Sequence, residues 1–103
     1  MSTDRELLEL AARATECSGY THEWINGPEF VIPGENPVVW DPLRDDGDAF
    51  RLAVQLGLWI HIGKYHTAIE GTHIEETARR GDSLAATRRA IVRAAAEIGK
   101  DMK

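Results

Sequence analysis

Residues 40–62 read WDPLRDDGDAFRLAVQLGLWIHI, and this stretch holds the two patterns that decide the fold. Four residues follow the i, i+3, i+4, i+7 spacing of an amphipathic helix: Phe50, Ala53, Val54 and Gly57. They predict a helix over about 45–56 that ends at a glycine. After that glycine, the residues from Leu58 to Ile62 alternate in polarity, which is typical of a strand.

Aspartates crowd the start of this predicted helix, at positions 41, 45, 46 and 48. Carboxylates there can accept hydrogen bonds from unpaired N–H groups of the first turn, and they complement the positive end of the helix dipole. We therefore interpret the cluster as a helix start, with Asp45 or Asp46 as the N-cap. Its spacing does not match a calcium-binding loop, and the terminal Glu of that motif has no counterpart.

Two further helices are predicted, one toward each end of the chain. Thr3 and Glu6 have the spacing of a capping box, which predicts a helix over about 3–17 with Cys17 at its last apolar position. Asp82 and Ser83 can cap a helix over about 83–99. Its apolar stripe contains Leu84, Ile91, Ala95, Ile98 and Met102.

Between these helices the sequence predicts one small sheet. Strands over about 58–62, 65–70 and 72–78 form an antiparallel meander with one apolar face. Residues 20–42 contain many Gly and Pro and are predicted as an irregular loop, in which 30–32 and 38–40 could each form an extended segment or edge strand. We expect a single α+β domain over 1–103, with three helices and a three-stranded antiparallel sheet arranged like an α/β/α sandwich.

The amino-acid composition narrows the classes of partner that this protein could bind. The 17 acids and 12 bases give a net charge of −5, which disfavours duplex nucleic acid as a partner. The acids concentrate in residues 1–50 and the bases in 51–103, which leaves self-association or a small anionic ligand open. The single cysteine allows no intrachain disulfide and favours an intracellular setting. No apolar run is long enough to predict a membrane span.

Metal and catalytic chemistry find little support. The candidate metal ligands show no spacing with known mechanics: His22, His61, His66, His73, Cys17 and Glu23. His61 and His73 could meet across neighbouring strands. We predict no metal, no cofactor and no enzymatic activity, although a hydrolase built from His and acids of separate strands stays open.

Basic residues near the start of the last helix are the best candidates for ligand binding. Arg79 precedes that helix, and Arg88 and Arg89 lie one to two turns into it, so the three could bind a phosphate together with the helix N-terminus. Trp59 or Tyr65 could stack on a base. Asp82 counts against this site because its carboxylate would occupy the same N–H groups. A solvated basic face and a protein interface are the alternatives.

A family resemblance covers about 60 of the 103 residues and starts at Trp40. It is carried by Trp40 with Pro42 and Leu43, by the segment DDGDAFRLAV and by the segment ATRRAIVRAA. These segments resemble the phage ABA-sandwich family, small proteins of tailed phages and prophages. The resemblance implies a helix, a variable loop, a short sheet and a final Ala-rich helix. It transfers no catalytic residues.

A phage or prophage origin leads to three functional hypotheses. The first is a counter-defence protein in the host cell cytoplasm that captures a nucleotide immune signal as a homo-oligomer, with Arg79, Arg88, Arg89, Trp59 and Tyr65 as contacts. The second is an inhibitor of a host defence complex that imitates nucleic acid, as anti-CRISPR proteins do, with an acidic surface: Glu29, Glu35, Asp41, Asp45 and Asp46. The third is a virion or morphogenesis component.

Overall fold

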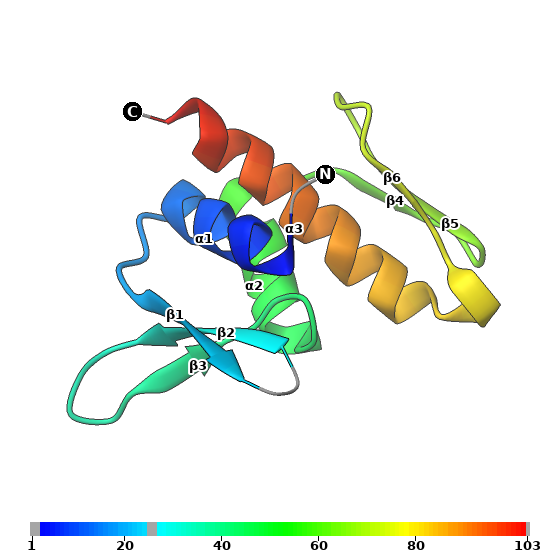
Figure 1. The fold of residues 1–103 in the computed structure, drawn as a ribbon. Coiled ribbons are helices and arrows are strands. Elements are labelled where there is room, and N and C mark those ends of the chain that lie inside the picture. Colours follow the sequence, from blue (N-terminus) through cyan, green and yellow to red (C-terminus); the bar gives the residue numbers. More distant parts are fainter. Residues whose placement is uncertain (1–2, 25–26, 103) are drawn as a thin grey trace.

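The computed structural model describes residues 3–24 and 27–102 as an α+β domain in which three helices lie between two small sheets (Figure 1). The helices are α1 (Asp4–Ala14), α2 (Asp46–Leu56) and α3 (Ser83–Asp101). The first sheet, sheet A, has the order β1 (Tyr20–Trp24), β2 (Gly27–Ile32) and β3 (Val38–Trp40). The second, sheet B, has the order β4 (Ile60–Ile62), β5 (His66–Ile69) and β6 (Glu75–Thr77). Both are antiparallel, so the predicted α+β class is confirmed.

Helix α1 begins at the predicted capping box but ends before Cys17. The Thr3 hydroxyl accepts the N–H of Glu6, and the Glu6 carboxylate accepts the N–H of Thr3. At the other end Glu16 adopts φ 57°, and the N–H of Cys17 donates to the carbonyl of Ala12. This left-handed turn is a Schellman ending, so Cys17 lies just outside the helix.

Helix α2 confirms the interpretation of the aspartates. Asp45 is the N-cap, and its carboxylate accepts the N–H of Asp48 at 2.8 Å. Asp48 in turn accepts the N–H of Asp41 at 2.9 Å, which ties the end of sheet A to the first turn of the helix. The helix stops at Gly57, whose φ of 65° is the left-handed conformation that glycine adopts without strain.

Only Ala53 of the predicted apolar stripe of α2 faces the core. Its buried residues are Ala49, Leu52 and Ala53, whereas Phe50 and Val54 are 68% and 64% exposed. Two of the three buried side chains are Ala, which lets α2 approach α3 closely. The main core consequently joins all three helices through Leu7, Leu52 and Val92 with their neighbours.

Sheet A replaces the irregular loop predicted over 20–42, and the extended segments expected at 30–32 and 38–40 are confirmed as the end of β2 and as β3. Pro28 occupies β2, while Pro33 and Pro37 flank the turn between β2 and β3. Phe30 pairs with Trp40 across these strands, with ring centroids 5.7 Å apart and the planes at 74°. Phe30 is buried against Leu8 and Ala12, so sheet A covers α1.

Sheet B covers α3 from the other side. Its strands are shorter than predicted, and its buried side chains Ile69 and Ile74 pack on Ala90 and Ala94 of α3. The outer face is open to solvent. The layer order is therefore sheet, helices, sheet, which corrects the expected α/β/α order and the expected single sheet (Figure 1).

Helix α3 runs through the middle of the domain and is lined by small residues. Ala90, Ala95 and Gly99 are buried, and α3 contacts α1, α2 and sheet B. A Cβ on Gly99 would lie only 1.8 Å from the carbonyl oxygen of Leu10, so α1 and α3 approach each other backbone to backbone. Small side chains on one helix are what permit such an approach.

Candidate functional site

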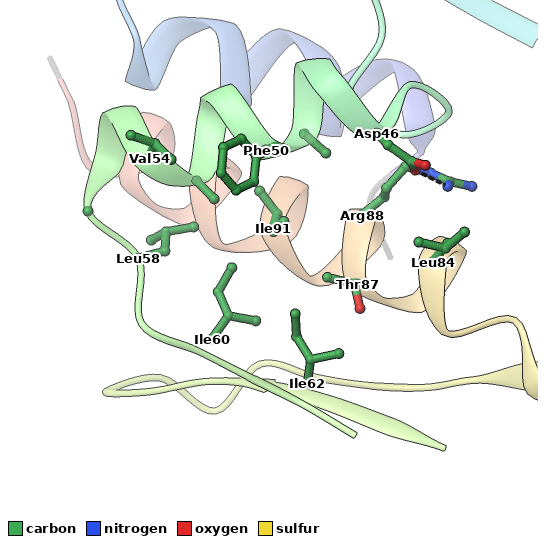
Figure 2. A pocket seen from close by; sticks show the side chains of 13 residues that line it. Asp46, Phe50, Val54, Leu58, Ile60, Ile62, Leu84, Thr87, Arg88 and Ile91 are labelled. Atoms are coloured by element: carbon green, nitrogen blue, oxygen red, sulfur yellow. Dashed lines mark hydrogen bonds and ion pairs between the residues drawn. The ribbon is translucent and has the colours of Figure 1, made fainter. Parts of the chain in front are cut away.

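An apolar groove of about 520 Å³ opens between α2 and β4, with α3 as its floor (Figure 2). We call it the α2–β4 groove. It is lined by residues from three elements and their junctions: Asp46, Ala49, Phe50, Ala53, Val54, Gly57, Leu58, Ile60, Ile62, Leu84, Thr87, Arg88 and Ile91. Its volume falls in the range of about 300–1,000 Å³ that is typical of binding pockets.

One wall of the groove consists of large side chains of α2. In the sequence, each of them directly follows a small side chain that is buried. Ala49 and Ala53 face α3, and the next residues along the sequence, Phe50 and Val54, project over the groove (Figure 2). These two positions are four residues apart and share one helix face. Asp45 caps the start of this helix by accepting the N–H of Asp48.

The opposite wall comes from the strand after Gly57. Leu58, Ile60 and Ile62 alternate with Trp59 and His61, so three apolar side chains point toward α2 (Figure 2). Leu58 and Ile60 pack against the core, while Ile62 is 64% exposed. The sequence alternation predicted this face, but its role as a wall of a groove was not predicted.

The charged groups of the groove neutralise each other. Arg88 donates to the carboxylate of Asp46 at 2.6 Å and to the carbonyl of Leu43 at 2.9 Å. No other charged residue lines the groove among those the structure describes. The Thr87 hydroxyl lies 3.0 Å from that of Thr67, which is fully buried, so the polar atoms of the floor also have partners.

The three arginines predicted as ligand contacts lie in two different places. Arg88 is held at the groove by Asp46 and Leu43. Arg79 and Arg89 line a separate polar cavity of about 450 Å³ at the start of α3, with Glu76 and Asp82. Arg89 also pairs with Asp4 at 3.1 Å, and Asp82 caps α3 through the N–H of Ala85.

The predicted aromatic contacts flank the strands of sheet B, and the Tyr65 carbonyl accepts the N–H of Ala78, the residue before Arg79, at 2.8 Å. Trp59 and Tyr65 are exposed on sheet B and line neither cavity. The ammonium of Lys64 lies 5.4 Å from the centre of the Tyr65 ring. The five predicted residues therefore do not converge on one pocket within a single chain.

The histidines have separate neighbours. His61 lies 3.1 Å from Glu70, and His66 lies 3.7 Å from Glu75. His73 lines a different cavity, beside Glu76 and Arg93. Within residues 3–24 and 27–102, no three His, Cys, Asp or Glu side chains are placed to hold a metal ion together.

Burial changes the pKa of Cys17 and of Asp41. Burial raises the pKa of the Cys17 thiol above its ordinary value. Burial also raises the pKa of Asp41, with a further contribution from Glu29, against the opposing effects of Arg44 and the N–H groups of Leu43 and Arg44. The Oδ1 atom of Asp41 is buried without a hydrogen-bond partner among the described residues.

Sequence reasoning missed the groove because it assigned the large residues of α2 and α3 to the core. Leu84 belongs to the predicted stripe of α3 and is instead 63% exposed at the groove. The available signal was the breadth of the apolar arc of α2, in which Ala49 and Leu52 extend the predicted stripe beyond Ala53. An apolar arc much wider than a core-facing stripe indicates that part of it is left for another contact.

Comparisons with known proteins found no match for this chain among family models, curated proteins or solved structures. In the part of the chain that the structure describes, no helix is both long and apolar enough to cross a bilayer.

Proposed function

We propose that this protein is a non-enzymatic binding protein that works by holding a protein surface in the α2–β4 groove. The observation that carries the proposal is the exposure of the groove's large apolar side chains, which is 63–68% for Phe50, Val54, Ile62 and Leu84. Exposed apolar patches rimmed by polar groups are typical of interaction sites.

A protein surface fits this groove better than a small molecule does. The residues at the bottom, such as Ala49 and Ile91, are already buried, and the exposed side chains stand on both walls and at the end of the groove. A small ligand resting on the floor would leave the outer parts of Phe50 and Leu84 in water. A surface that spans both walls would cover them and gain the favourable free energy of burying apolar area.

The phage resemblance gives this binding role a context. A small binding protein of a phage or prophage that acts against a host defence, in the host cytoplasm, would need such a surface and no catalytic machinery. This context rests on the segments at Trp40, 45–54 and 86–95 and on the exposed groove, and it is part of the proposal.

Photocrosslinking tests the proposed role directly. Phe50 is replaced by p-benzoylphenylalanine, the protein is produced in bacterial cells, and the cells are irradiated. We expect discrete crosslinked products from position 50. The matched control is the same replacement at Tyr20, an exposed aromatic residue of β1 in sheet A. Equal or absent crosslinking from both positions would contradict the proposal.

Nucleotide capture is a second candidate, and the shared cavity of Arg79 and Arg89 is the observation that favours it. Two guanidinium groups on one cavity could bind a phosphate by charge-assisted hydrogen bonds. A nucleotide that binds the native state should raise the melting temperature, and Arg79→Ala should abolish the rise. No shift across a panel of mono-, di- and cyclic nucleotides would exclude this candidate.

A further inference from the structure

We infer that the occupant of the α2–β4 groove is a second copy of this chain, in a two-fold symmetric dimer in which Phe50 of each copy enters the groove of the other. This inference rests on the proposed function and names the partner.

The first argument is that one face supplies both halves of the contact. A two-fold interface uses the same patch on both copies, so the patch must be complementary to itself. The face combines a hollow over Ala49, Ala53 and Ile91 with protruding side chains at Phe50 and Leu84 (Figure 2). A protruding side chain of one copy can therefore enter the hollow of the other.

The second argument is electrostatic. Covering a groove costs free energy when it buries an unpaired charge, and the only charged residues among the described lining are Asp46 and Arg88, which pair with each other at 2.6 Å. The groove therefore demands no countercharge from its partner. It favours an apolar, neutral surface, and this same face is such a surface.

The size of a typical interface sets what such a dimer needs beyond the groove itself. A stable interface covers about 800 Å² on each partner and about 20–30 residues a side. The chain has a surface of 6805 Å², so such a contact would take roughly an eighth of it. The thirteen groove residues would form the apolar centre, and their exposed neighbours on α2, such as Asp45 and Arg51, would form the polar rim.

The test is the mass of the protein in solution, measured by light scattering and sedimentation from one to several hundred micromolar. We expect the wild type to approach twice the chain mass of 11.5 kDa. Val54→Glu should raise the dissociation constant by about thirtyfold or more, the effect of losing a hot-spot side chain. Phe50→Glu is a second variant with the same expectation, and circular dichroism verifies that both fold.

The matched control is Val39→Glu, which introduces the same side chain at a half-exposed position of β3 in sheet A. It should leave the dimer intact. A monomeric wild type, or a dimer broken by Val39→Glu and unaffected by Val54→Glu, would overturn the inference. A monomer that still crosslinks from position 50 to another protein rejects the second copy and leaves the proposed function standing. A monomer without such crosslinks rejects both.

Discussion

Asp41 is a charged residue in a place that favours its neutral form. Its side chain is largely buried between sheet A and α2, one carboxylate oxygen has no hydrogen-bond partner among the described residues, and the other lies 3.5 Å from Arg44. Because burial raises its pKa in the folded state, protonation stabilises the native chain. This contribution is complete below the unfolded-state pKa and is lost as the pH rises through the folded-state pKa.

The variant Asp41→Asn should therefore be more stable than the wild type at pH 7, and the difference should shrink as the pH is lowered toward the acidic range. The lost ion pair with the half-exposed Arg44 costs little. Thermal melting across pH measures both effects. A destabilised Asp41→Asn at pH 7 would show that the Arg44 pair outweighs the burial cost.

Gly99 sets the distance between α1 and α3. Gly99→Ala would place a methyl group 1.8 Å from the carbonyl oxygen of Leu10, and only a movement of the helices can relieve this contact. We expect a loss of about 1–3 kcal/mol or more in the free energy of unfolding, which exceeds the gain in helix propensity of about 1 kcal/mol. Urea titration measures it.

The control for that experiment is Gly34→Ala, because a Cβ at Gly34 has nothing within 4 Å. It should change the unfolding free energy by less than about 0.5 kcal/mol. Equal effects at the two positions would mean that the helix contact does not limit stability.

The helices could be predicted from the sequence because their signals are local. The capping box at Thr3 and Glu6, the N-cap at Asp45 and the glycine at position 57 each act within a few residues, and each is present in the structure. The end of α1 was placed three residues too late because Glu16 adopts a left-handed conformation that its residue type does not signal.

Only two extended segments of sheet A, 30–32 and 38–40, could be predicted from local sequence, because the sheet itself depends on pairing between distant residues. Phe30 is placed by Trp40 across the sheet and by Leu8 from α1, and none of these contacts leaves a local pattern. The prediction of which side of α2 is buried was wrong for a related reason. Ala53 lies at the centre of a broad apolar arc, and packing against α3 buried the side with Ala49 and Leu52 and left the side with Phe50 and Val54 exposed.

A pair of threonines joins sheet B to α3 and can be tested as an element contact. The hydroxyls of Thr67 and Thr87 lie 3.0 Å apart, and Thr67 is fully buried. Thr67→Val should cost about 1–3 kcal/mol because it leaves the Thr87 hydroxyl without its partner.

The double variant Thr67→Val with Thr87→Val should cost less than the sum of the two single changes, since both polar groups are then removed. Chemical denaturation of the four proteins completes this cycle. Additive costs would show that the two hydroxyls do not depend on each other.

At the scale of the whole molecule, the helices lie between the two sheets, and neither sheet covers the α2–β4 groove that we assign to self-association. Core substitutions and groove substitutions should consequently have different signatures. Leu52→Ala should lower the stability of the chain by about 2–5 kcal/mol at every concentration, because Leu52 is buried in the helical core.

The melting temperature of the wild type should rise with protein concentration, as mass action requires for a dimer. For Val54→Glu it should be independent of concentration, because Val54 is exposed in the single chain and contributes little to its folding. Differential scanning calorimetry over a hundredfold range of concentration distinguishes the two. A concentration-independent wild type would argue against assembly through this face.

The turn between β2 and β3 offers a practical route to studying this protein. Residues 33–37 are exposed, connect β2 to β3 and line none of the described cavities, and Figure 1 places them well apart from sheet B. A fluorophore or affinity handle attached there would leave both the helical core and the groove unobstructed. Immobilised by that turn, the protein would present its apolar face to any molecule in solution.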